Sequence, residues 1–160
     1  MHQLPSGSGS ARRRSCEALG GVQTRSPGIQ STYPAMEGLQ ELLDHAIDAG
    51  IKVVVVSSGQ SEPIVRWLEA RALDRYVMHV VGADSVQTGK PGAAPYQRAV
   101  ELLALRPSEC LAVEDSESGV MSAHAAYVFT VKIGRESATE VALVADLHEV
   151  VQELLSRHAR

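Results

Sequence analysis

The chain has 160 residues, which is the size of one domain, and a domain of about this length buries roughly 70% of its unfolded surface. A hydrophobic content of 44% and a charged content of 21% are ordinary for a globular protein, and a formal net charge of -4 provides no positive field to attract nucleic acid. The two cysteines lack CxxC spacing, and no apolar run reaches the ~20 residues of a membrane span, so we expect a cytoplasmic protein without a disulfide framework, zinc site or membrane partner.

Residues 1–32 are rich in Ser, Gly, Gln and Pro and show no amphipathic period. Such a segment has too little apolar surface to offset chain entropy, so we interpret it as a disordered or poorly ordered leader before a core over residues 33–160. An organellar targeting segment is the alternative, because the segment contains Arg12–Arg14 and Arg25 but only one acidic residue, Glu17.

The first predicted helix extends from Met36 to Ile47, where apolar residues recur at helical spacing until Gly50. An uninterrupted β-branched run follows from Lys52 to Val56. It is too short for a helix and shows no alternation, which is typical of a strand covered on both faces.

Helices and strands continue to alternate along the rest of the chain. Further strands are predicted over residues 76–81, 110–113 and 127–133, and further helices after Ser61, from Pro95, over residues 118–126 and after Asp146, which with Glu149 resembles a capping box. This alternation implies right-handed crossovers, and therefore an α/β fold with a Rossmann-like, doubly wound parallel sheet.

Polar residues follow the predicted strands where each strand ends. Ser57 follows one strand, Glu114 and Asp115 end another, and Lys90 lies in an intervening loop. Ligands gather at the carboxyl edge of such sheets, where a hydroxyl, an ammonium and two carboxylates suit a phosphate bound with Mg²⁺. Each of these residues taken alone also fits a turn or a solvated loop.

Three stretches carry a resemblance to a known family. The stretches are Val53–Ser57 followed by Ser58-Gly59, then Gly89-Lys90-Pro91, then Glu114-Asp115-Ser116 with Gly119. They resemble three of the four motifs of the haloacid dehalogenase (HAD) superfamily. The similarity is greatest to its phosphoglycolate phosphatase and β-phosphoglucomutase branch, and it covers residues 33–156.

The resemblance implies a role for each matched residue. Ser57 and Lys90 are the implied catalytic residues that hold the phosphoryl oxygens, with the backbone of Ser58 and Gly59 also binding the phosphate, and Glu114 and Asp115 are the implied Mg²⁺ ligands. The implied substrate is a small phosphorylated metabolite. Phosphoryl transfer depends mainly on such donors and cations around the equatorial oxygens.

The first motif of the family, Asp-x-Asp at the end of the central strand, does not occur in this sequence. Asp44 and Asp48 belong to the first helix, at the wrong end of the sheet, and Gly20–Gln23 is a weak candidate for the strand. We therefore expect a truncated HAD-like core whose central first strand and cap are missing. A further departure is Ala125-Ala126-Tyr127, where the family usually carries a glycine.

Together these features predict a phosphatase or phosphomutase core with little or no activity, because the Asp nucleophile is absent. The alternative is a non-catalytic interaction protein, a truncated product that pairs with itself or with another chain through open sheet edges. A nucleotide-binding module is disfavoured, because no G-x-G-x-x-G or G-x-x-x-x-G-K-[ST] loop occurs.

Overall fold

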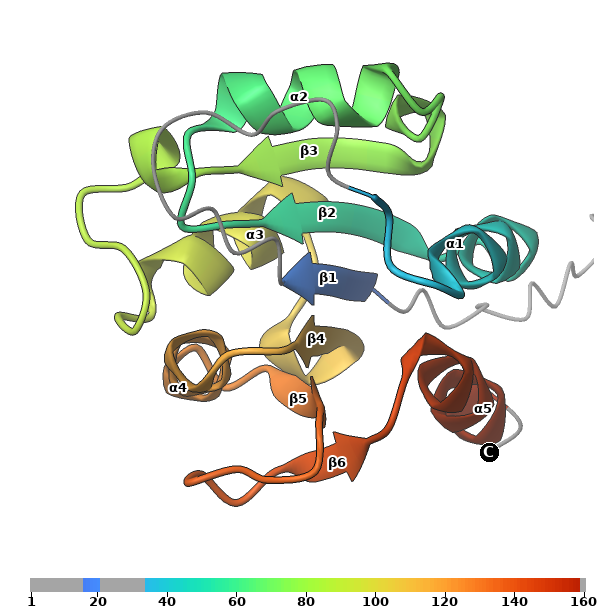
Figure 1. Ribbon diagram of the computed structural model, residues 1–160. Coiled ribbons are helices and arrows are strands. Elements are labelled where there is room, and N and C mark those ends of the chain that lie inside the picture. The colour runs from blue at the N-terminus through green and yellow to red at the C-terminus, as the bar shows by residue number, and fades with distance from the viewer. Residues whose placement is uncertain (1–15, 21–33, 159–160) are drawn as a thin grey trace, which may run out of the picture.

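The computed structural model describes residues 16–20 and 34–158, with side chains described from residue 34 to residue 152 (Figure 1). Its six strands form one sheet in the order β3-β2-β1-β4-β5-β6, and every described strand pairing is parallel. The strands are β1 (Cys16–Gly20), β2 (Lys52–Val56), β3 (Val77–Val81), β4 (Cys110–Glu114), β5 (Phe129–Ile133) and β6 (Ala142–Val144).

Helices cover both faces of this sheet. They are α1 (Leu39–Asp48), α2 (Ser61–Glu69), α3 (Ala94–Leu103), α4 (Glu117–Ala125) and α5 (Leu147–His158), with single 3-10 turns η1 (Asp74–Tyr76), η2 (Ala83–Ser85) and η3 (Pro107–Glu109). Figure 1 shows α3 and α4 on one side and α1 and α5 on the other. The fold class predicted from the sequence, a doubly wound parallel α/β sheet, is confirmed.

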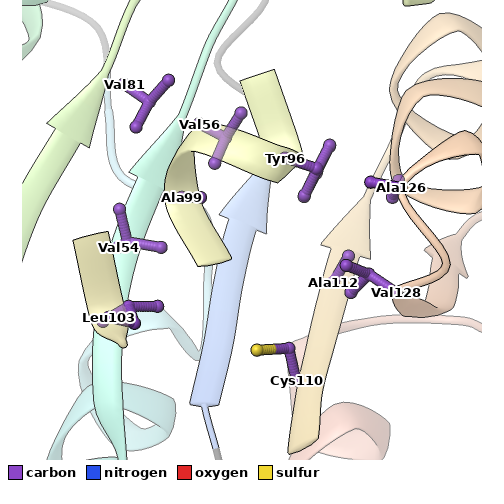
Figure 2. Close-up of a cluster of buried hydrophobic side chains, with 11 residues drawn as sticks. Val54, Val56, Val81, Tyr96, Ala99, Leu103, Cys110, Ala112, Ala126 and Val128 are labelled. Carbon is purple, nitrogen blue, oxygen red and sulfur yellow. The ribbon is translucent and has the colours of Figure 1, made fainter. Parts of the chain in front are cut away.

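The core forms on both faces of β2, which explains its unbroken apolar sequence. Val53 and Val55 pack with α1 and α2, whereas Val54 and Val56 pack with α3 (Figure 2). All four valines are buried, and alternate residues of a strand point to opposite faces. The predicted strand therefore has the bounds expected from the sequence.

The position of β1 corrects the expectation that the central strand is missing. Cys16–Gly20 lies between β2 and β4 and pairs in parallel with both. Backbone groups at the centre of a buried sheet need partners on both sides, and this segment supplies them although it lacks the β-branched residues that signal a strand. The core therefore includes part of the expected leader, whereas residues 1–15 and 21–33 lie outside the described residues.

The other predicted elements agree with the structure to within a few residues, except that β6 was not predicted. Asp146 accepts hydrogen bonds from the backbone N–H groups of His148 and Glu149, and the Glu149 carboxylate accepts from Ala145 N. The capping prediction for the last helix is thus correct in kind, with the Glu149 bond displaced by one residue. None of the helices in the described part of the chain is long and apolar enough to cross a membrane.

Candidate functional site at the carboxyl edge of the sheet

Lys90 joins the ends of two strands that flank β1. Its Nζ donates to the carbonyl oxygen of Val56, the last residue of β2, at 3.2 Å, and also donates to Glu114 Oε1 at the end of β4. The side chain of Lys90 is 4% exposed, so this bridge is buried. The loop between η2 and α3 thus brings Lys90 to the carboxyl edge of the sheet, next to the residue that precedes Ser57.

Glu114 is fully buried and accepts hydrogen bonds from several groups. Besides Lys90, the hydroxyl of buried Tyr96 donates to Oε1, and Ser116 Oγ donates to Oε2 at 3.4 Å. Burial raises the pKa of Glu114, although Lys90 and Tyr96 act in the opposite direction. Burial, together with the Glu114 charge, raises the pKa of Tyr96 well above its ordinary value. Both Glu114 oxygens are therefore engaged by protein donors.

Ser57 follows β2 and is 4% exposed. Its backbone N donates to Val81 O at 2.9 Å, which ties the end of β2 to the end of β3. Its hydroxyl oxygen accepts from Gly59 N at 3.1 Å, so the hydroxyl defines the turn that leads to α2. Ser57, Ser58 and Gly59 thus form one compact turn at the same edge as Lys90.

Asp115 differs from Glu114 in its bonding. Its Oδ1 is buried and has no hydrogen-bond partner among the described residues. Ser116 beside it caps α4, because its Oγ accepts from Gly119 N at 3.1 Å. Burying a carboxylate oxygen without a hydrogen-bond partner is costly unless a bound ligand supplies the missing interaction.

The donor set fits Mg²⁺ as a site with few protein ligands. Within the described residues no three of His, Cys, Asp and Glu gather into a metal cage. Mg²⁺ commonly takes one or two carboxylates and fills its octahedron with water and substrate phosphate, and the orphaned Asp115 oxygen matches that pattern.

Several polar side chains at this edge were not predicted from the sequence. The Tyr96 hydroxyl is one, and a second group centres on Lys132, whose Nζ donates to Glu117 Oε1 and to Glu136 O, both at 2.5 Å. Glu117 also accepts from Ala138 N at 3.1 Å, which ties the loop after β5 to the start of α4. A lysine within the apolar run of β5 was the available signal, because lysine is rarely buried without a partner.

The end of β1 carries no carboxylate. Gly20 is the last residue of β1 and lies in register with Val56, between the strand ends that Lys90 joins. Glu17 pairs with Val53 and Leu111, towards the amino end of the strand. The structure therefore brings Ser57, Lys90, Glu114 and Asp115 to one edge, with glycine at the central strand end.

Comparison with known proteins identifies similarity over most of the chain. Residues 23–133 match the family model described as haloacid dehalogenase-like hydrolase, a range that excludes β1. Hexitol phosphatase A of Escherichia coli is 36% identical over 81% of this chain and 62% of its own length. Beta-phosphoglucomutase of Bacillus subtilis is 27% identical over 62% of this chain and 43% of its own length. The chain thus spans less than two thirds of either relative.

Among solved structures, a HAD-superfamily hydrolase from Ehrlichia chaffeensis superposes with a TM-score of 0.70 at 23% identity, over 76% of this chain and 58% of that one. At this level of identity the likeness concerns the fold. It agrees with the parallel sheet and flanking helices described above.

Proposed function

Because the chain belongs to the haloacid dehalogenase-like hydrolase family, we propose that it is a phosphoryl-transfer core that binds Mg²⁺ and the phosphate of a small phosphorylated metabolite, with little or no turnover. Its similarity to a phosphatase and to a phosphomutase supports phosphoryl-transfer chemistry. The observation that carries the proposal is the Lys90 bridge between the ends of β2 and β4. The residue after Glu114, Asp115, adds a carboxylate oxygen without a hydrogen-bond partner in the described part of the chain.

Lys90 and Ser57 are the proposed phosphate ligands. An ammonium group has three donors, of which Val56 O and Glu114 Oε1 take two among the described contacts, so one donor is left for a phosphoryl oxygen. The Ser57 hydroxyl accepts from Gly59 N and keeps its own proton to donate. The turn backbone of Ser58 and Gly59 is the proposed remaining contact.

Asp115 is the proposed Mg²⁺ anchor, and bound Mg²⁺ would neutralise charge on the phosphoryl oxygens. Glu114 has a different part in this arrangement from the one its motif implies. Because its oxygens accept from Lys90, Tyr96 and Ser116, it orients the ammonium group from a buried position.

Weak or absent turnover follows from the composition of β1. The strand is Cys-Glu-Ala-Leu-Gly, and the whole sequence contains no Asp-x-Asp. A carboxylate at the central strand end is the covalent nucleophile that the family resemblance implies, and glycine cannot attack phosphorus. Binding is thus expected to persist without the chemical step.

A binding experiment tests the first half of the proposal. Inorganic phosphate and Mg²⁺ are titrated into the full chain by calorimetry, and thermal unfolding is measured in parallel. We expect each ligand to tighten binding of the other, Asp115→Asn to abolish the Mg²⁺ effect, and Ser57→Ala to weaken phosphate binding. Asp48→Asn, at the end of α1 next to the start of β2, is the matched control and should bind normally. Equal binding by all variants would refute the site.

Hydrolysis of an aryl phosphate with and without Mg²⁺ tests the second half. We expect no rate above the uncatalysed background for the wild-type chain. Robust turnover that disappears in Asp115→Asn would contradict the proposal, because some other group would then serve as nucleophile. Size-exclusion chromatography run beside it tests the pairing alternative, which assumed an unfilled sheet centre that β1 occupies. A monomer is the expected result.

A further inference from the structure

The register between β1 and β4 places the two cysteines of the chain side by side. Cys16 and Cys110 are Cα partners at the first position of the parallel ladder. The sequence contains no other cysteine, and the separation of these two along the chain gave no sign that they meet. The two cysteine positions thus lie in register on the neighbouring central strands β1 and β4.

The general spacing of neighbouring strands falls within the range of Cα separations that disulfides join. Neighbouring strands lie about 4.7–4.9 Å apart, and disulfides usually join Cα atoms separated by about 4.4–6.8 Å. Paired positions on adjacent strands also lie on the same face of the pleated sheet. For Cys110 this is the face covered by α3, and Figure 2 shows its sulfur directed toward the side on which β1 lies.

The surroundings of Cys110 keep its thiol buried. Cys110 is 5% exposed, and its Sγ lies 3.4 Å from the carbonyl oxygen of Arg106. Its cluster is otherwise apolar apart from the hydroxyl of Tyr96. An oxidant in solution therefore reaches this thiol most readily when β1 leaves its place, because β1 is the neighbouring strand on that side.

We propose that Cys16 and Cys110 are a redox pair whose intramolecular disulfide fixes β1 in the centre of the sheet. With a low-molecular-weight disulfide such as oxidised glutathione as the oxidant, one cysteine thiolate attacks a glutathione sulfur and releases one reduced glutathione. The second thiolate attacks the resulting mixed disulfide and releases the other. Two protein thiols are thus oxidised and one small disulfide is reduced to two thiols.

The proposed disulfide would hold β1, a strand whose residues have weak strand preference. Ala, Leu and Gly in β1 give little strand preference compared with the valines of β2, yet β1 holds both halves of the sheet together. A disulfide between Cys16 and Cys110 encloses most of the chain in one covalent loop. Such a loop restricts the unfolded state and keeps β1 close to β4. Oxidation therefore controls how firmly the central strand is held.

The test incubates the full chain with oxidised glutathione, removes the reagent and measures intact mass and thiol content. We expect the loss of two hydrogens, no accessible thiol after denaturation, a peptide linking Cys16 to Cys110, and monomers on a non-reducing gel. The midpoint of thermal unfolding should rise by roughly 5 to 15 °C and return on reduction.

A register control separates pairing in the sheet from random encounter. In Cys16→Ser/Glu17→Cys the thiol moves by one position, to the partner of Leu111, and so to the opposite face from Cys110. This variant should cross-link at least ten times more slowly than the wild-type chain. Four outcomes would each overturn the proposal. They are equal rates in both chains, a stable mixed disulfide at one cysteine, disulfide-linked dimers, and two intact thiols under conditions that oxidise the urea-unfolded chain.

Discussion

Lys90 and Glu114 form an ion pair whose side chains are 4% and 0% exposed, at the point where the ends of β2 and β4 flank β1. Neither charge has solvent to replace its partner. Removal of one member of a buried pair typically costs about 3 to 5 kcal/mol, because the remaining charge stays buried. We therefore expect Lys90→Met to lower the free energy of unfolding by about that amount.

Lys90→Met/Glu114→Gln tests this explanation. The double variant removes both charges and leaves an amide oxygen that can accept from the Tyr96 hydroxyl. We expect it to be more stable than Lys90→Met alone, measured by urea denaturation of wild type, Lys90→Met, Glu114→Gln and the double variant. If the two single effects simply add in the double variant, the charges do not interact as the structure indicates.

Gly119 gives room for the Glu114 carboxylate. A Cβ atom at Gly119 would fall directly on that carboxylate, which is held between Lys90 and Tyr96 and cannot move aside. We expect Gly119→Ala to lower the free energy of unfolding by about 2 to 4 kcal/mol. Gly89→Ala is the control, because a Cβ there meets no atom within 4 Å. Comparable losses in both variants, measured by urea denaturation, would show that the steric argument is wrong.

Asp84 caps α2 from outside the helix. Its Oδ1 accepts from Ser61 N and from Ser61 Oγ, both at 2.8 Å. We expect Asp84→Ala to lower the free energy of unfolding by about 1 kcal/mol, the usual cost of a lost N-cap, and Asp84→Asn to lose less because its amide oxygen can still accept. Chemical denaturation near neutral pH measures both values.

The same contact predicts a dependence of stability on pH. The hydrogen bonds from Ser61 lower the pKa of Asp84 in the folded chain, so the unfolded chain binds the proton more readily. The stabilising contribution is complete above the pKa of the unfolded chain and is lost as the pH falls through the folded pKa. Urea midpoints measured from about pH 6 down to about pH 3 should fall less steeply for Asp84→Asn than for wild type. Parallel curves would count against this assignment.

Tyr127 has a left-handed backbone with a φ of 59° and a side chain that is 86% exposed. This conformation strains residues with a Cβ, and the exposed ring gains little from packing. We expect Tyr127→Gly to raise the free energy of unfolding by about 0.5 to 1 kcal/mol, and Tyr127→Ala to leave it nearly unchanged. Thermal unfolding of the three chains decides whether the gain comes from the backbone.

Strands with a run of apolar, β-branched residues could be predicted from the sequence, because such a run indicates burial on both faces. β2 is covered on both faces, and its sequence after Lys52 is an unbroken run of valines. At the ends of β2 and β4 the sequence changes abruptly from apolar to polar residues, which indicated Ser57, Glu114 and Asp115 as candidate site residues. Because parallel strands end at one edge, the meeting of these residues could be inferred before the structure was known.

β1 could not be predicted in the same way. Its five residues have weak strand preference, and its place depends on partners that lie far along the chain. The hydrogen-bond partners of Glu114 could not be predicted either. The motif indicates a carboxylate at this position, but it does not indicate that Tyr96 and Lys90 donate to it. In both cases tertiary contacts decide the outcome, and a local pattern does not record them.

Of the described strands, β1 is synthesised first and waits longest for its second partner. β1 can bind one side to β2 early in synthesis, but its other side waits for β4, which begins at Cys110. Closing so long a loop is slow compared with local helix formation. During that interval the nascent chain exposes a half-paired edge, and we expect this period, rather than the finished fold, to be when chaperones and proteases compete for it.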